Sequence, residues 1–122
     1  MKDVYIYDSI RTPRGKGRKD GALHEVSALS LSVTAIDAIA GRNDLEGHAV
    51  EDVIWGNVTQ VGEQGACLAR TAVLASQLDE SIPGLSINRF CASGLELSLI
   101  HISEPTRRYA ISYAVFCLKK KK

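Results

Sequence analysis

Apolar residues along the first 96 positions fall into short runs that predict β-strands and longer repeats that predict helices. Residues 4–7 form a β-branched and aromatic run that ends at Asp8, and residues 50–55 form a second run that closes at Gly56. A third run covers residues 85–87, after a Pro-Gly turn. Runs of this length and composition, bounded by turn residues, are typical of strands. The pattern therefore predicts three strands in this part of the chain.

Two stretches between these runs have helical character. Ser27 can cap the first helix, and Gly41 ends it. Its apolar residues recur at spacings of four, three and four, which places them on one face: Leu29, Val33, Ile36 and Ala40. Residues 66–76 predict a second helix that is small and apolar nearly all round, which indicates a buried element. Proline, glycines and basic residues at 11–17 predict a solvated loop.

The order strand, helix, strand, helix, strand predicts an α/β fold with crossover connections. With 122 residues the chain forms one domain at most. In sheets of this kind, ligands and catalytic groups gather at the carboxyl ends of strands. Cys91 comes just after the third predicted strand, so its position draws attention to it.

Composition and charge exclude several classes of function. The 15 basic and 14 acidic residues leave a net charge of +1, so no overall field favours nucleic acid or an anionic membrane. No apolar stretch reaches the roughly 20 residues needed to span a bilayer. The three cysteines form no C-x-x-C pair, which argues against a zinc or redox site. Their odd number, and a start without a secretory pattern, predict a cytoplasmic protein.

The segment 88–96 reads Asn-Arg-Phe-Cys-Ala-Ser-Gly-Leu-Glu, and it leaves two interpretations of Cys91 open. Near an apolar segment, a cysteine is more often an inert core residue. At a helix N-terminus, however, unpaired amides and a partial positive charge favour the thiolate, which is the nucleophilic form. Small neighbours such as Ala92 and Gly94 would then let an acyl substrate approach the sulfur.

The same segment closely resembles the N-terminal signature of the thiolase family, in which an Asn-x-x-Cys-small-Ser-Gly sequence carries the acylated cysteine. Two more segments match thiolases in order and spacing: Arg-Thr-Pro-x-Gly at 11–15 and Gly-Asn-Val at 56–58. The related ketosynthases match less well, because their nucleophile usually lies in a Thr-Ala-Cys-Ser-Ser type of segment. The resemblance implies a thiolase-type layered α/β fold, with residues 1–96 as the first part of its N-terminal domain.

The resemblance also implies a reaction. In thiolases the thiolate, here that of Cys91, attacks the keto carbon of a 3-oxoacyl-CoA, releases acetyl-CoA and passes the acyl group to a second CoA. The reverse reaction joins two molecules of acetyl-CoA. The backbone amide of Cys91 would be one donor of an oxyanion hole. Coenzyme A thioesters are then the substrates, no metal or further cofactor is expected, and the intact parent enzyme is expected to be a homodimer or homotetramer.

Other catalytic groups of thiolases, namely an activating histidine, an Asn-Glu segment and a second cysteine, lie in downstream segments that this chain does not contain. His24 and His48 match no thiolase motif and are interpreted as surface residues. Cys67 is interpreted as a packing residue, and Cys117 lacks the glycine-rich surroundings of the second catalytic cysteine. We therefore expect an inactive fragment of an acyltransferase. The alternative is a non-catalytic remnant that at most associates with other subunits through exposed sheet edges and apolar helix faces.

Residues 97–122 depart abruptly from the thiolase pattern. The segment 97–107 resembles, codon by codon, a translated sequencing-library adapter; residues 111–118 resemble the next adapter part, and the terminal lysines match a poly-A run. We therefore interpret residues 97–122 as an artefactual tail. The alternative is an interaction tail, in which an apolar segment followed by four lysines touches an anionic membrane surface. Pro105 argues against that alternative, because proline interrupts an amphipathic helix.

Overall fold

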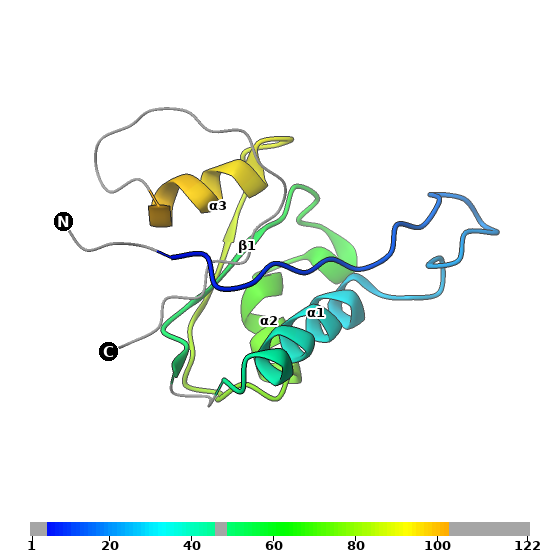
Figure 1. Ribbon diagram of the computed structural model, residues 1–122. Helices are drawn as coiled ribbons and strands as arrows, with labels where there is room; N and C mark the ends of the chain where they lie inside the picture. The colour runs from blue at the N-terminus through cyan, green and yellow to red at the C-terminus, as the bar shows by residue number, and fades with distance from the viewer. Residues whose placement is uncertain (1–4, 46–48, 103–122) are drawn as a thin grey trace.

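Helices and two short strands make up the regular structure of the part of the chain that the structure describes. The computed structural model describes residues 5–45 and 49–102, with side chains through residue 99. Within these residues the elements follow one another as drawn in Figure 1: α1 (Ala28–Arg42), β1 (Val53–Gly56), the 3-10 helix η2 (Gly62–Gln64), α2 (Leu68–Ala75), β2 (Gly84–Ile87) and α3 (Ser93–Ile102).

The two strands run parallel, with Val53 opposite Gly84 and Gly56 opposite Ile87. The chain passes from β1 to β2 through α2, which contacts both strands. Parallel neighbours need such a crossover, because a tight turn can join only antiparallel strands. The predicted α/β class is confirmed, and the strands predicted at 50–55 and 85–87 are found as β1 and β2.

The strand pair lies between two helical layers (Figure 1). Successive side chains of a strand point to opposite faces of the sheet. Val53, which is 1% exposed, points into the core shared with α1 and α2. Ser86 faces the same way, since its Oγ lies 3.4 Å from the backbone nitrogen of Ala69 in α2. Gly56 belongs to the other face, where it lies against Ser93 of α3. Helix α3 thus covers the face opposite α2.

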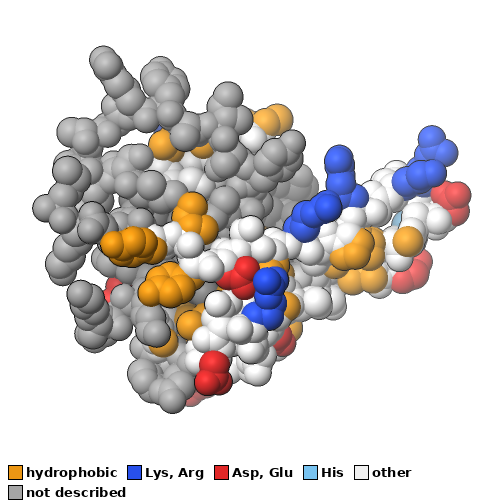
Figure 2. Space-filling model, in the orientation of Figure 1, with side chains coloured by type: hydrophobic (Ala, Val, Ile, Leu, Met, Phe, Trp, Pro, Cys, Tyr) orange, Lys and Arg blue, Asp and Glu red, His pale blue; other side chains and the backbone are white. Residues whose placement is uncertain are grey.

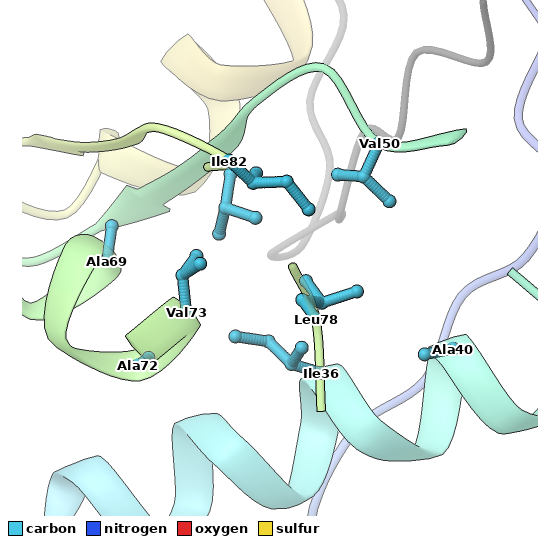
Figure 3. Packing of buried hydrophobic residues seen from close by; sticks show 9 residues of the cluster. Ile36, Ala40, Val50, Ala69, Ala72, Val73, Leu78 and Ile82 are labelled. Carbon is cyan, nitrogen blue, oxygen red and sulfur yellow. The ribbon is translucent and has the colours of Figure 1, made fainter. Parts of the chain in front are cut away.

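Helices α1 and α2 share one hydrophobic core with the strands. Figure 3 shows side chains from both helices and from segments beside the strands pointing toward one another. The core comprises Ile36, Ala40, Val50, Val53, Ala69, Ala72, Val73, Leu78 and Ile82. The predicted apolar face of α1 is confirmed, because Ile36 and Ala40 are buried and Leu29 packs against the core. Full burial of one side chain of this kind stabilises a fold by roughly 1.5–3 kcal/mol.

Both ends of α1 are held by polar contacts. The Ser27 side chain accepts a hydrogen bond from the Ser30 amide, so the predicted cap is confirmed. The Glu63 carboxylate of η2 accepts from the Ala28 amide at 3.0 Å, a contact across 35 residues. At the other end the helix runs one residue past Gly41 to Arg42. Caps of this kind satisfy amides that have no partner within the helix.

Residues 5–7 do not form the predicted first strand. Their side chains are 62–72% exposed, and no strand is assigned to them; Val4 lies outside the described residues. Instead, the Asp8 carboxylate forms an ion pair with Arg42 at 3.2 Å and accepts a hydrogen bond from the Asn43 side-chain amide at 3.0 Å. A strand needs a neighbouring edge to pair with, and in the described part of the chain β1 and β2 pair only with each other.

Helix α2 is buried on one side only. It begins and ends inside the predicted range 66–76. Ala69, Ala72 and Val73 are fully buried against α1 and the strands, whereas Leu74 is 57% exposed. The predicted buried helix is therefore confirmed, and its outer face is exposed.

Candidate functional site

Cys91 lies in the turn that joins β2 to α3, with its side chain exposed. The first residue of α3 is Ser93, so the cysteine precedes the helix by two positions. This is the strand-to-helix placement expected from the sequence. The core-residue interpretation of Cys91 is wrong, because the side chain is open to solvent rather than packed. The neighbouring Ala92 is also exposed, which leaves the approach to the sulfur free of bulk on that side.

The turn is built around Phe90, whose φ of 50° lies in the left-handed region that non-glycine residues rarely adopt. Asn88 folds over it, because its side-chain Oδ1 accepts a hydrogen bond from the Phe90 amide at 2.9 Å. Ser93 holds the turn from the other side. Its hydroxyl accepts from the Arg89 amide at 2.9 Å and donates to the Phe90 carbonyl at 2.7 Å. Cys91 is thus framed by hydrogen bonds on both flanks.

The Gly-Asn-Val segment at 56–58 lies next to this turn. A Cβ atom on Gly56 would stand 3.1 Å from the Ser93 Cβ, so a larger residue here would require α3 to move slightly away from β1. The Asn88 side chain donates to the Val58 carbonyl at 3.0 Å. Two of the three segments singled out in the sequence are therefore brought together around Cys91.

Asn57 is a buried polar residue beside this turn. Its backbone amide donates to the Ile87 carbonyl at 2.9 Å, which extends the β1–β2 pairing by one bond. Its side chain donates to the Gln64 carbonyl at 2.9 Å and so ties η2 to the end of β1. A buried amide without such partners would be costly. Asn57 therefore fixes the strand end on which the Cys91 turn rests.

The third segment, at 11–15, belongs to a long projecting loop (Figure 1). Gly15 packs there against Leu23, and the loop encloses an open hollow lined by Gly15, Lys16, Gly17, Arg18, Lys19, Leu23 and His24. Figure 2 shows Lys and Arg side chains gathered on this projecting part. The loop expected at 11–17 is confirmed, and its basic side chains are solvated as predicted.

An ion pair spans the turn. The Arg89 Nε lies 3.3 Å from the Glu96 Oε2, with the arginine side chain 65% exposed. An exposed pair of this type contributes at most about 1 kcal/mol. It ties the residue two positions before Cys91 to the first turn of α3.

Cys67 occupies a different environment at the start of α2. Its sulfur donates to the Gly84 carbonyl at 3.3 Å and lies 3.6 Å from the Ser86 hydroxyl. Burial by itself raises the pKa of the Cys67 thiol, but hydrogen bonds from the Arg70 backbone and the Ser86 hydroxyl, with smaller help from the Ser86 and Ala69 backbones, bring that pKa below its ordinary value. Its side chain packs against the core, as expected.

One of the two histidines that were expected at the surface lies in the described part of the chain. His24 is exposed and its Nδ1 lies 2.6 Å from the Glu25 carboxylate, which confirms it as a surface residue. His48 lies outside the described residues. In the part of the chain that the structure describes, no three His, Cys, Asp or Glu side chains stand together as metal ligands. None of the helices described there is long and apolar enough to cross a membrane.

The sequence pattern singles out Cys91 but not the residues that support its turn. Asn88 and Ser93 are part of the same motif, and their side chains hold the turn. A signal for Asn88 exists, since asparagine side chains often accept a bond from the amide two residues on. No local signal marks Ser93, because its role depends on the backbone shape that Phe90 adopts.

Known proteins are similar to this chain in both sequence and fold. The family model described as "Thiolase, N-terminal domain" matches residues 4–103. The 3-ketoacyl-CoA thiolases of Cronobacter sakazakii and Escherichia coli O1:K1 are each 40% identical over 97 residues, covering 79% of this chain and 25% of the relative. The crystal structure of the Bacillus anthracis acetyl-CoA acetyltransferase superposes with a TM-score of 0.60 at 32% identity, covering 67% of this chain and 21% of that one. The chain spans about a quarter of the length of the curated relatives it matches.

Proposed function

This chain belongs to the thiolase family, and from that membership we propose that Cys91 is the nucleophile that carries the acyl group. The observation that carries the proposal is the placement of Cys91: it is exposed, in a braced turn, between the end of a parallel strand and the start of a helix. Such a place lets the sulfur meet a substrate while the backbone behind it stays fixed.

The proposed reaction begins with attack of the Cys91 thiolate on the keto carbon of a 3-oxoacyl-CoA. The bond between that carbon and the α-carbon breaks, the acyl group stays on the sulfur, and the departing acetyl-CoA carbanion takes up a proton. A second CoA thiol then attacks the thioester, and Cys91 is restored. In reverse, the same steps condense two molecules of acetyl-CoA.

The hydrogen bonds of the turn support a role for the Cys91 backbone amide. The amides of Arg89, Phe90, Ala92 and Ser93 are all bonded within the turn. Among the described residues, none accepts a hydrogen bond from the Cys91 amide. An amide held rigidly and left without a partner can donate to the negative oxygen that develops on the attacked carbon. We therefore assign it to the proposed oxyanion hole.

The rest of the proposal concerns the whole enzyme. The substrates are acyl-CoA thioesters, no further cofactor is required, and the intact enzyme is a cytoplasmic homo-oligomer, either a dimer or a tetramer. Residues 1–96 form the first part of the thiolase N-terminal domain, and residues 97–122 are an artefactual tail. Family membership and the sequence pattern support these proposals.

A second candidate function is favoured by one observation, the quarter-length match to the curated relatives. In that case the chain by itself is a non-catalytic remnant, although the parent enzyme is a thiolase. Catalytic groups act as a unit, so a nucleophile without its base, acid and second oxyanion donor retains little of the rate enhancement. The purified 122-residue chain should then show no measurable thiolysis of acetoacetyl-CoA. Robust CoA-dependent turnover would contradict this candidate.

The nucleophile is tested by substitution in the intact enzyme that carries this segment. Cys91→Ser should lower the turnover of acetoacetyl-CoA by about a thousandfold or more, because a serine hydroxyl is not ionised as a thiol is. Cys67→Ser is the matched control, since it exchanges the same atoms at a cysteine outside the proposed site. Near-normal turnover in Cys91→Ser would overturn the proposal.

A further inference from the structure

Phe90 adopts a backbone conformation that its side chain does not favour. Its φ of 50° lies where the Cβ of an L-residue crowds the backbone, and glycine is the residue that adopts it freely. Packing of the Phe90 ring does not offset the cost of this conformation, because the residue is 74% exposed. Something other than burial of the ring must therefore hold the turn in this shape.

The hydrogen bonds around Phe90 identify what holds it. Asn88 Oδ1 accepts from the Phe90 amide at 2.9 Å, while the Asn88 amide group donates to the Val58 carbonyl at 3.0 Å. The Asn88 side chain therefore connects the turn to the segment that follows β1. From the other side, the Ser93 hydroxyl donates to the Phe90 carbonyl at 2.7 Å. The two peptide groups flanking Phe90 are both fixed by side chains.

We propose that Asn88 is a positioning residue for Cys91, because its side chain holds Phe90 in the left-handed conformation that presents the Cys91 side chain to solvent ahead of α3. The left-handed residue reverses the chain between β2 and α3. Without it, Cys91 would continue along the strand direction or turn into the helix. Asn88 itself touches neither the sulfur nor the substrate in this role. The proposal rests on Cys91 being the nucleophile, but its test does not.

The test measures how fast iodoacetamide alkylates Cys91, read by peptide mass mapping, in the 122-residue chain fused to a cysteine-free carrier protein. Alkylation needs no CoA and no other catalytic group, so it reports on the presentation of the thiol alone. Asn88→Ala should slow alkylation of Cys91 about fivefold, the ratio that corresponds to the loss of one hydrogen bond. Asn88→Ser should retain most of the rate, because a serine hydroxyl can also accept from the amide two residues on.

The decisive comparison removes the backbone strain. In a Phe90→Gly background, Asn88→Ala should change the rate less than about twofold, because glycine adopts the left-handed conformation without support. In a Phe90→Ala background the fivefold loss should persist, since alanine lacks the ring but keeps the Cβ. If the two backgrounds respond equally to Asn88→Ala, or if Asn88→Ala alone leaves the rate unchanged, the proposal is wrong.

Two measurements separate positioning from loss of the fold. Cys67 in the same chain is half-buried, so general loosening would speed its alkylation while a local change at the turn would not. If Asn88→Ala does not fold, substitutions at Phe90 still decide: glycine should preserve the rate and Phe90→Val should lower it several-fold, because a β-branched residue is the least tolerant of positive φ. Equal rates for these two variants would overturn the proposal. A failure of acyl transfer with these results intact would instead count against the proposed function.

Discussion

The two described cysteines differ in what surrounds each sulfur. Cys91 is exposed in a turn, whereas Cys67 is half-buried and faces the Gly84 carbonyl and the Ser86 hydroxyl. A low pKa by itself does not make a nucleophile, because the sulfur must also be reached by the substrate. Cys91, which is exposed, is therefore more open to a substrate than the half-buried Cys67.

The lowered pKa of Cys67 gives a prediction about pH. A depressed pKa means that the fold stabilises the thiolate, so the native chain should form it at a lower pH than the unfolded chain does. The midpoint of the rate of Cys67 alkylation against pH should lie lower in the native chain than in urea. The corresponding stability is present above the pKa of the unfolded thiol and is lost as the pH falls through the folded pKa. A native midpoint at or above the midpoint in urea would contradict this account of the hydrogen bonds.

Residue-scale features were predictable where the signal is local. Ser27 as a cap and Cys91 as the residue between strand and helix both follow from their immediate neighbours. The bond from Ala28 to Glu63 joins residues 35 positions apart, so no sequence window contains it. The left-handed Phe90 was equally hidden, because aromatic residues rarely adopt positive φ and local propensity argues against it.

At the scale of elements, the contact between β1 and α3 decides where the Cys91 turn stands. Gly56→Ala places a Cβ at 3.1–3.3 Å from Ser93 and the Gly94 backbone nitrogen, so α3 must shift away from the strand. Overpacking of this kind destabilises a fold by about 1–3 kcal/mol. Urea unfolding of the chain should show this loss.

Gly41→Ala is the matched control for that substitution. Nothing lies within 4 Å of a Cβ built at Gly41, and the residue is in the last turn of α1. Alanine there should stabilise the fold by about 0.5–1 kcal/mol, because it restricts the unfolded chain and favours the helix. If both substitutions change the free energy of unfolding in the same direction, the close contact of β1 with α3 is not as described.

Elements were predicted correctly where the spacing of apolar side chains indicates both the type of element and its buried face. The α1 face and the two paired strands follow from apolar spacing. The strand predicted at residues 4–7 has the right composition, but residues 5–7 are not assigned as a strand, because pairing is a property of the sheet rather than of the segment. Composition therefore identifies strand-forming residues without showing that an edge is available to them.

At the scale of the whole molecule, the strand pair separates α1 and α2 from α3, and the turn carrying Cys91 stands where β2 passes into α3 (Figure 1). The α/β class was predictable because strands and helices alternate along the chain. How the segments at 56–58 and 88–96 meet was not, because it depends on the parallel register of β1 and β2. The family match to residues 4–103 and helix α3 both continue beyond the boundary expected at residue 96.

The proposed tail makes a prediction about the gene. Genomic DNA of the source organism should continue past Glu96 without the segment 97–122, and should encode an apolar residue at 97, since Leu97 is only 5% exposed in α3. A native helix would be expected to keep burying an apolar face, whereas Pro105 costs about 3 kcal/mol inside a helix. A genomic frame that encodes residues 101–122 followed by a stop codon would contradict the tail interpretation.

The central claim, that Cys91 carries the acyl group, is tested most directly by locating that group. The intact enzyme that contains this segment should be incubated with acetyl-CoA, quenched in acid and mapped by peptide mass spectrometry. The account predicts an acetyl thioester on the peptide that contains Cys91, which disappears when free CoA is added before the quench. An acetyl group found on Cys67, or none on Cys91, would contradict it.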